Sequence, residues 1–328
     1  MRVEQEAAVA AAVAALARGE LVGLPTETVY GLGANAADPA AIARLYAAKG
    51  RPADHPVIVH IANPAALARW VREVPPAARA LAAACWPGPL TLVLPRALEV
   101  LDAVTGGQDT VAVRCPDHPL ALALLEACAT AGIHGLVAPS ANRFGRLSPT
   151  EAAHVQQEFG PEVALVLDGG PCAVGIESTI VEVKGDDVRV LRPGMLSAAA
   201  LAEVLGRALA GANAAASRVS GALPAHYAPR TPLRLLDGAA CVQRAMSLAA
   251  QGQRAAVLGS AATLAALPKG AISQLAPLAA SDYARRLYAD LRTLDGAGAA
   301  EILVEQPPTG GDWQGIYDRL SRAARASV

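Results

Sequence analysis

The chain has 328 residues, of which 53% are hydrophobic and 17% charged, and its 28 Lys and Arg nearly balance its 29 Asp and Glu. At roughly 150 residues per domain, this length indicates about two domains with separate cores. The mean hydropathy of +0.32 is raised by alanine, and no apolar run reaches the roughly 18 residues that span a bilayer, so a membrane-spanning protein is excluded. The near-neutral charge argues against binding of nucleic acid by charge alone, so a histone-like protein is excluded as well.

The first two hundred residues combine short apolar runs, bounded by Gly, Pro or Asp, with longer helical stretches. Strands are predicted at 21–25, 57–61, 90–94, 110–114, 136–139, 165–167, 179–183 and 188–191. Helices are predicted at 5–18, 39–48, 64–72, 76–85, 118–131, 150–159 and 197–210, with Asp38, Asn63 and Ser148 as caps before a first-turn proline. Because the strands do not strictly alternate with helices, we expect residues 1–207 to form an α/β domain with a mixed, twisted sheet and flanking helices.

Residues 208–230 are rich in small side chains and lack large apolar anchors, which predicts a linker. This segment closes with His226-Tyr227-Ala228-Pro229, which is too rich in chemical groups for a plain spacer. Beyond it, residues 231–328 predict a small parallel Rossmann-like α/β domain, with strands at 233–236, 255–258 and 301–304 and helices at 239–251, 281–294 and 313–326. That domain has neither a G-x-G-x-x-G motif nor a P-loop, so no dinucleotide or nucleoside triphosphate site of its own is expected.

The first predicted strand runs into a polar segment, Thr26-Glu27-Thr28-Val29-Tyr30-Gly31-Leu32-Gly33. Hydroxyl side chains followed by two glycines suit a polar pocket at a strand end, where the backbone approaches a ligand closely. The alternative is a threonine-rich turn with glycine at positive φ.

Lys49 and Arg51, separated by one glycine, place two cations in a loop at a predicted helix end. Such a pair suits an anion such as a triphosphate, whereas the alternative is ordinary charges that complement the helix dipole. The chain has three lysines beside 25 arginines, so a lysine at this position is unusual and favours a functional role. Even so, the sequence supports the two interpretations about equally.

Further polar and cationic side chains lie next to other predicted strands. Arg114 ends one of them, where its guanidinium suits either a carboxylate ligand or a structural ion pair. Without a G-x-S-x-G elbow or a histidine partner by spacing, a hydrolase is disfavoured. Without zinc-ligand spacing, any metal would be Mg²⁺ carried by phosphates. The whole set predicts a pocket for an anionic ligand with a polar second ligand: Thr28, Lys49, Arg51, Arg114, Ser140, Asn142, Ser148, Ser178 and Arg192.

The five cysteines show neither C-x-x-C nor metal-ligand spacing: Cys85, Cys115, Cys128, Cys172 and Cys241. An odd number in a long chain does not indicate a disulfide framework. We therefore expect a reducing compartment, the cytoplasm.

Five motifs in this order resemble the YrdC-type threonylcarbamoyl-AMP synthases: Pro25-Thr26-Glu27-Thr28-Val29-Tyr30-Gly31-Leu32, Lys49-Gly50-Arg51-Pro52, Pro139-Ser140-Ala141-Asn142, Ser178-Thr179-Ile180 and Arg192-Pro193-Gly194. The His226-Tyr227-Ala228-Pro229 segment and the second α/β domain resemble the longer, two-domain branch of that family. The resemblance implies a nucleotidyltransferase that converts L-threonine, bicarbonate and ATP into L-threonylcarbamoyladenylate and pyrophosphate, the first step of the t6A modification of tRNA.

The resemblance also implies roles for individual residues. Thr28, His60, Arg114 and Ser178 would hold L-threonine, and Arg51, His55, Thr110, Ser140, Asn142, Ser148, Arg192 and Tyr227 would hold ATP. Lys49 and Arg51 would be catalytic at the phosphates, with Mg²⁺ carried by ATP and no metal site on the protein. His55 stands where similar members usually have Asn, and its imidazole can still donate one hydrogen bond.

The implied chemistry needs no enzyme nucleophile, because the threonine carbamate itself attacks the α-phosphorus of ATP. Catalysis would come from aligning two anions and neutralising phosphate charge, while Arg114 holds the threonine carboxylate by two contacts. The unstable adenylate needs shelter from water, so we expect residues 208–230 to act as an active-site lid as well as a linker. Downstream proteins that transfer threonylcarbamoyl to tRNA would receive the product, and neither membrane binding nor strong direct nucleic-acid binding is expected.

Two other functions compete with this interpretation. A cationic concave surface would suit a double-stranded RNA or tRNA-binding module without turnover, although the near-neutral charge and the hydroxyl-rich pocket count against it. A transferase that carbamoylates another acceptor uses the same fold, but such enzymes should carry acylphosphatase-like and zinc-finger segments that this sequence lacks.

Overall fold

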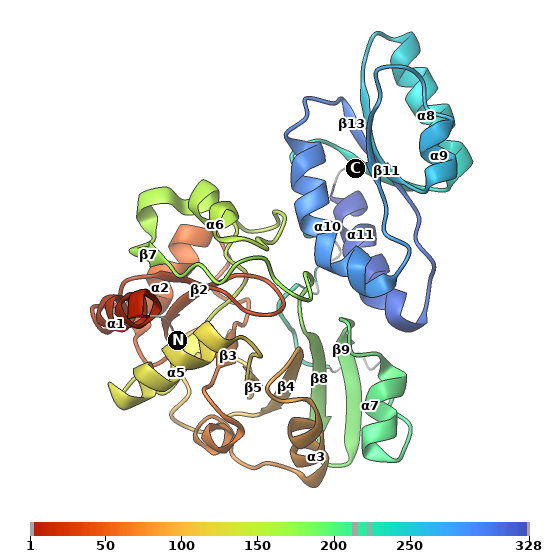
Figure 1. Ribbon diagram of the computed structural model, residues 1–328. Coiled ribbons are helices and arrows are strands. Elements are labelled where there is room, and N and C mark those ends of the chain that lie inside the picture. Colours follow the sequence, from red (N-terminus) through yellow and green to blue (C-terminus); the bar gives the residue numbers. More distant parts are fainter. Residues whose placement is uncertain (1–2, 212–215, 222, 224, 327–328) are drawn as a thin grey trace. The chain divides into compact units, whose positions relative to one another are not determined.

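The computed structural model describes residues 3–211, 216–221, 223 and 225–326 (Figure 1). The chain separates into two compact units. The first contains Met1–Phe144 and Pro149–Ala222, and the second contains Gly145–Ser148 and Leu223–Val328. A short piece of chain inside the first half of the sequence therefore folds with the second unit.

Within the described residues, the first unit is built on a nine-stranded sheet in the order β7-β1-β2-β6-β3-β5-β4-β8-β9. The pairs β1–β7, β3–β5 and β4–β8 are parallel, and the other neighbours are antiparallel. The predicted mixed sheet is therefore confirmed. In chain order the strands are β1 (Val22–Leu24), β2 (Gly31–Asn35), β3 (Ile58–His60), β4 (Leu90–Pro95), β5 (Thr110–Arg114), β6 (Leu136–Val137), β7 (Leu165–Val166), β8 (Thr179–Lys184) and β9 (Asp187–Arg192).

Apolar side chains of this sheet pack against helices in two separate buried clusters, one of which joins α1 and α5 to β1. Leu16, Leu24 and Leu124 are fully buried in that cluster, and each such side chain contributes about 1.5–3 kcal/mol through removal from water. The other cluster includes Ile42 of α2 and Leu81 of α3. The helices of the first unit are α1 (Val3–Ala17), α2 (Pro39–Lys49), η1 (Pro64–Arg69), α3 (Pro76–Cys85), α4 (Asp102–Thr105), α5 (Pro119–Thr130), α6 (Ala152–Phe159), η2 (Gly160–Glu162) and α7 (Ala198–Leu205).

Two of the three predicted caps are confirmed. The carboxylate of Asp38 accepts the N–H groups of Ala40 and Ala41, at 2.9 and 3.2 Å, and starts α2. The Asn63 side chain accepts the Ala66 N–H at 3.2 Å and starts the predicted helix, η1, which is a 3₁₀ helix.

The predicted cap at Ser148 is wrong, because α6 starts only at Ala152. The carbonyl oxygens that a helix would need are committed to other parts of the unit. Pro149 O accepts the Tyr30 N–H at 2.9 Å, and Thr150 O accepts the Cys172 N–H at 3.0 Å. These residues therefore run alongside the polar segment before the helix begins.

The two glycines after Tyr30 begin a strand, β2, that the sequence did not predict. Neither Gly31 nor Gly33 has positive φ, so the alternative of a turn with left-handed glycine is not realised at these positions. A Cβ atom on Gly33 would lie 2.9 Å from a methyl group of Leu24, and one on Gly31 would lie 3.1 Å from the Ala138 Cβ. Glycine is needed here because neighbouring segments of the same chain approach it closely, and not because it can adopt positive φ.

The second unit has a four-stranded parallel sheet in the order β10-β13-β11-β12, counted over its described residues. The predicted small parallel α/β fold is confirmed. The edge strand β12 and the short helix α9 were not predicted. They have only four and five residues, so neither gives a long periodic signal in the sequence. The elements are β10 (Leu233–Leu236), α8 (Gly238–Ala250), β11 (Ala255–Gly259), α9 (Ala261–Ala265), β12 (Ile272–Leu275), α10 (Ala280–Asp295), β13 (Glu301–Glu305), η3 (Gly311–Trp313) and α11 (Gln314–Arg325).

Candidate functional site

Polar side chains gather at one edge of the nine-stranded sheet. Parallel β3 and β5 pair His60 with Arg114 at their carboxyl ends. Strand β4 runs antiparallel to β5 and parallel to β8, so Ser178, directly before β8, lies at the same edge. Strand β9 returns antiparallel to β8 and ends there at Arg192. The topology thus brings together four predicted site residues that are far apart in the sequence.

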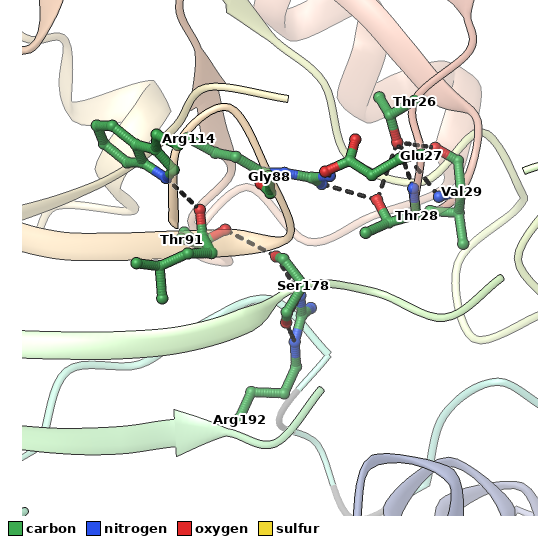
Figure 2. Close-up of polar contacts among 11 residues, drawn as sticks. Thr26, Glu27, Thr28, Val29, Gly88, Thr91, Arg114, Ser178 and Arg192 are labelled. Carbon is green, nitrogen blue, oxygen red and sulfur yellow. Dashed lines mark hydrogen bonds and ion pairs between the residues drawn. The ribbon is translucent and has the colours of Figure 1, made fainter. Parts of the chain in front are cut away.

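Arg114 is held on three sides by buried polar groups (Figure 2). Its side chain is only 5% exposed. Nη1 donates to Thr28 Oγ1 at 2.8 Å, and Nε donates to Gly88 O at 3.2 Å. Nη2 lies 2.5 Å from Oε1 of Glu27, whose side chain is 7% exposed. The structural ion pair that the sequence left open is therefore present, and it fixes the guanidinium at the strand edge.

The segment after β1 is a turn built from threonine hydroxyls (Figure 2). Thr26 Oγ1 donates to Val29 O at 2.6 Å and accepts the N–H groups of Thr28 and Val29. Because the Thr26 proton is committed to Val29 O, Thr28 is the donor in the 2.9 Å contact between the two hydroxyls. Thr28 Oγ1 in turn accepts from Arg114. The turn and the arginine therefore belong to one directed chain of hydrogen bonds.

His60 is a neutral imidazole beside that arginine. It is 2% exposed, and burial followed by the charge of Arg114 lowers the pKa of His60 to about 3. Its Nδ1 lies 3.3 Å from Ile58 O, and since a carbonyl only accepts, Nδ1 is the donor. Nε2 is then left as an acceptor. The ring can accept a hydrogen bond from a hydroxyl group without carrying charge.

Ser178 contacts both Thr91 of β4 and Arg192 at the end of β9 (Figure 2). Its hydroxyl lies 2.7 Å from Thr91 Oγ1. Arg192 Nη2 donates to the Ser178 carbonyl at 2.9 Å and to its hydroxyl at 3.2 Å. Arg192 Nη1 donates to Ser220 O at 2.9 Å. The second buried guanidinium is thus anchored between β8 and the described part of the linker.

Lys49 holds the loop that follows β6. Its side chain is 2% exposed, and Nζ donates to Ser140 O and to Asn142 O, both at 2.6 Å. Burial, and then the neighbouring charge of Arg51, lower the pKa of Lys49 well below its usual value. The backbone of Ser140 and Asn142 is therefore positioned by the lysine that the sequence singled out.

Arg51 and His55 both pack against the aromatic ring of Phe144 in the first unit. The Arg51 guanidinium carbon is 5.9 Å from the centre of the Phe144 ring, and the His55 ring packs against it edge-on at 5.4 Å. Arg51 Nη2 also donates to Pro56 O at 2.7 Å and to Ser220 Oγ at 3.3 Å. Partial burial, and then Arg51, lower the pKa of His55, so its imidazole is neutral near pH 7.

The described linker residues 216–221 lie against several of these groups. Ser217 Oγ donates to Glu182 Oε1 at 2.6 Å, because a carboxylate only accepts, and Thr110 Oγ1 lies 2.9 Å from the same serine oxygen. Together with the contacts of Ser220, this places the linker beside three predicted ATP ligands, Thr110, Arg51 and Arg192.

The other two predicted ATP ligands, Ser148 and Tyr227, belong to the second compact unit. Tyr227 has a positive φ of 62°, a conformation that a residue with a side chain rarely adopts. Its ring lies 5.2 Å from the guanidinium of Arg319. Next to it, the Ala228 N–H donates to Gly145 O at 2.8 Å. The His226–Pro229 segment therefore pairs with the short piece of chain that contains Ser148.

Sequence reasoning missed two side chains at this edge, Glu27 and Thr91. Glu27 is the one acid in an otherwise hydroxyl-bearing motif, and a buried acid needs a partner. Thr91 is a polar residue in the apolar run Leu90–Leu94. Both signals are visible in the sequence, but neither identifies the partner.

Metal and membrane features were searched over the described part of the chain. No group of three or more His, Cys, Asp and Glu side chains is arranged to hold a metal ion there. Among the same residues, no helix combines the length and apolar character needed to cross a bilayer.

Two family profiles match consecutive parts of the chain. Residues 14–194 match a family described as Telomere recombination, and residues 196–325 match the C-terminal domain of threonylcarbamoyl-AMP synthase. The threonylcarbamoyl-AMP synthase of Pyrococcus abyssi is 38% identical over 317 residues, covering 93% of this chain and 91% of the relative. The Bacillus subtilis enzyme of the same name is 38% identical over 337 residues, covering 98% and 94%.

The chain belongs to the threonylcarbamoyl-AMP synthase family. The resemblance found in the sequence, including its longer two-domain branch, is confirmed. The crystal structure of Sua5 from P. abyssi complexed with L-threonine matches with a TM-score of 0.90 and 34% identity, covering 100% of this chain and 96% of that chain. Fold and family therefore agree over both units.

Proposed function

We propose that the chain synthesises L-threonylcarbamoyladenylate from L-threonine, bicarbonate and ATP, with release of pyrophosphate. The observation that carries this proposal is the buried Arg114, which lies among hydroxyl groups and a neutral imidazole at the strand edge that also holds Arg192. An amino acid with a hydroxyl side chain needs such a cation for its carboxylate and such acceptors for its hydroxyl.

The threonine half of the site is proposed to consist of Thr28, His60, Arg114 and Ser178. The Arg114 fork binds the carboxylate, and its ion pair with Glu27 keeps the fork oriented. Nε2 of His60 is the free acceptor of that ring and suits the threonine hydroxyl. Because the imidazole is neutral, it does not compete with Arg114 for the carboxylate.

The ATP half is proposed to consist of Arg51, His55, Thr110, Ser140, Asn142 and Arg192 in the first unit. Ser148 and Tyr227, which belong to the second unit, stay proposed ATP ligands because the family resemblance implies them. Arg51 and Arg192 supply charge for the phosphates, and both already contact Ser220. Lys49 remains a proposed catalytic residue, and its bonds to Ser140 O and Asn142 O support an additional role in holding that loop.

The proposed reaction needs no covalent enzyme intermediate. The threonine nitrogen forms a bond to the carbon of bicarbonate, with loss of hydroxide and a proton as water, which gives the carbamate. A carbamate oxygen then forms a bond to the α-phosphorus of ATP, and the bond from that phosphorus to the pyrophosphate oxygen breaks. Arg51 and Arg192 act by aligning the two anions and balancing the charge on the leaving group.

Mg²⁺ is proposed to enter with ATP rather than through a protein site. This fits the preference of Mg²⁺ for phosphate oxygens. The linker is proposed to act as a lid, which the contacts of Ser217 and Ser220 with Thr110, Arg51 and Arg192 support. The adenylate is proposed to pass, in the cytoplasm, to proteins that transfer the threonylcarbamoyl group to tRNA.

A pyrophosphate-release assay tests the proposal. Purified protein with ATP, bicarbonate and Mg²⁺ should release pyrophosphate only when L-threonine is added, and D-threonine should not replace it. Mass spectrometry should detect the adenylate in the same samples. Equal release with and without L-threonine would contradict the synthase, and tight tRNA binding without release would favour the binding module instead.

A further inference from the structure

The second unit contains a cavity of about 170 Å³ that none of the proposed chemistry uses. It lies at the carboxyl ends of the parallel strands, where Ser260 follows β11, Ala276 follows β12 and Glu305 ends β13. Tyr283 of α10 and Trp313 of η3 complete the wall. The cavity is therefore shaped by every strand of this sheet except β10.

Its position is the one at which open parallel sheets bind ligands. Strands β11 and β13 are neighbours, and the connections that follow them leave toward opposite faces of the sheet, β11 into α9 and β13 into α11 (Figure 1). Such a divergence opens a crevice outside the carboxyl ends of the two strands. From the sequence no dinucleotide or triphosphate site is expected here, and that expectation does not concern a smaller ligand.

Tyr283, a residue that lines this cavity, has a buried hydroxyl without a hydrogen-bond partner. Tyr283 is 3% exposed, and its hydroxyl forms no hydrogen bond. A buried polar group left in this state is unfavourable. Its ring packs edge-on against Trp313, with ring centres 5.6 Å apart and planes at 74°. Burial raises the pKa of Tyr283, so the hydroxyl stays protonated.

The same cavity contains a carboxylate without a cation. Glu305 Oε2 accepts the Ser260 N–H at 2.6 Å. Partial burial acts to raise the pKa of Glu305, but hydrogen bonds from Ser260 and Thr263 outweigh it and hold the pKa below its usual value. No Lys, Arg or His side chain lines the cavity. The negative charge is therefore held in place, and the lining does not neutralise it.

We propose that this cavity binds a small organic ammonium ion. Glu305 is the counter-ion, the Tyr283 oxygen accepts one N–H, and the rings of Trp313 and Tyr283 contact the cation and its alkyl body. A cavity of about 150 Å³ holds a benzene molecule, so this one suits a body of similar size. A phosphate or carboxylate inside the cavity would meet Glu305 with no cation in the lining, which favours a cation as the ligand.

An alkylammonium head can come from a free amine or from a lysine side chain of another protein. The titration therefore uses three probes: n-butylammonium, spermidine, and a lysine capped as Nα-acetyl-lysine methylamide. A shift with spermidine identifies a free amine as the source, and a shift with capped lysine but not spermidine identifies a protein side chain. Either result supports an ammonium site.

Fluorine NMR of the full chain labelled with fluorotryptophan provides the readout. The chain has three tryptophans, and Trp70 and Trp86 are core residues of the first unit, so their signals are internal references. The Trp313 signal, assigned by its loss in Trp313→Phe, should shift saturably with n-butylammonium. It should not shift with n-butanol, which has the same size and no charge, or with sodium chloride at equal concentration.

Two substitutions separate the charge from the hydroxyl. Glu305→Gln keeps an acceptor for the Ser260 N–H and should weaken n-butylammonium binding at least tenfold. Tyr283→Phe should weaken it about three- to tenfold while leaving the Tm equal or higher, because it removes an unsatisfied hydroxyl. Tyr317→Phe, in α11 and outside the cavity, should change neither. No Trp313 shift with any ammonium probe, or equal shifts with n-butanol, would overturn the proposal, as would unchanged affinity in a folded Glu305→Gln variant.

Discussion

Two opposite charges, those of Glu27 and Arg114, lie buried side by side at the edge of the first sheet. Taking both out of water is unfavourable, and their attraction repays this only while both are present. The pair is therefore weak evidence for stability, but it is a strong constraint on where the guanidinium points. This makes Glu27 a positioning residue for Arg114 in the proposed threonine site.

The pair predicts a large penalty for removing one partner. Arg114→Met should lower the free energy of unfolding by about 3–5 kcal/mol, because it leaves Glu27 buried without a cation. Adding Glu27→Gln should recover much of this loss. Urea denaturation measures both values. Arg79→Met, at an exposed site of α3, should stay within about 0.5 kcal/mol of the parent. A single Arg114→Met variant as stable as the parent would contradict the prediction.

His60 gives the protein a defined sensitivity to acid. Burial and then Arg114 lower the pKa of His60 from 6.5 to about 3, so between these values the unfolded chain binds a proton that the folded chain does not. Acidification in this window lowers the free energy of unfolding by about 1.4 kcal/mol per pH unit. His60→Gln removes this contribution, so from pH 6.5 to pH 5 it should lose about 2 kcal/mol less stability than the parent.

Denaturant titrations at the two pH values measure this difference. The matched control is His134→Gln, because His134 is an exposed histidine of the same unit and should keep the pH dependence of the parent. If His60→Gln and the parent lose the same stability on acidification, His60 is not held neutral by the fold.

At the scale of elements, α2 positions the loop after β6 through its last residue. The helix ends at Lys49, and Gly50 follows at φ 60° as a left-handed cap, which only glycine adopts freely. This end directs the lysine ammonium to the carbonyl oxygens of Ser140 and Asn142. The geometry of the proposed ATP loop therefore depends on where a helix stops.

Lys49→Met should release that loop while keeping most of the buried alkyl chain. The KM for ATP should rise, and kcat/KM for ATP should fall about 100-fold, because misplacement of about an ångström is enough for such a loss. The KM for L-threonine should change much less. Steady-state pyrophosphate release with each substrate varied measures both. Lys184→Met, at the exposed end of β8, should match the parent, and an equal rise in both KM values would contradict a loop-specific role.

Most elements could be predicted from sequence because apolar runs and capping residues are local signals. Asp38 capped its helix as expected, since an Asx side chain followed by proline needs only its own next residues. Ser148 has the same local pattern and failed, because Pro149 O is taken by Tyr30 across the unit. Strand β2 was missed for the same reason. Its glycines are needed because Leu24 and Ala138, which are not their sequence neighbours, approach them closely.

In the candidate site, too, the residues themselves could be predicted from the sequence, but their partners could not. Arg114, Ser178 and Arg192 could be proposed because cations and hydroxyls at predicted strand ends are visible in the sequence. Their pairing could not, since Glu27 reaches Arg114 and Thr91 reaches Ser178 only after the sheet order is known. Motif residues are local, whereas their hydrogen-bond partners are set by topology.

At the scale of the whole molecule, basic and acidic residues nearly balance on each side of Arg230. Through Arg230 the chain has 18 basic and 21 acidic residues, and beyond it 10 and 8. Tight sequence-independent binding of nucleic acid requires many cations facing the phosphates. The four cations of the proposed site, Lys49, Arg51, Arg114 and Arg192, are instead buried and engaged with protein groups.

Direct tRNA binding should therefore be weak. In a mobility-shift titration at 0.15 M salt we expect a Kd above roughly 10 µM, the range of non-specific binding. Pyrophosphate release with L-threonine should proceed at the same rate with and without tRNA. A nanomolar Kd that falls steeply with added salt would contradict this and revive the binding-module alternative.

The piece Gly145–Ser148 has a consequence for how such a chain can be divided. The polypeptide passes from one compact unit to the other at residue 145, returns at 149 and leaves again at 223. A gene cut in the linker would strand four residues whose backbone partners, Ala228 and Arg292, are encoded after the cut. A fragment of this chain that ends in the linker therefore lacks the groups that bind Gly145 O and Leu147 O, so this loop is the first part to redesign if the first unit is to be made alone.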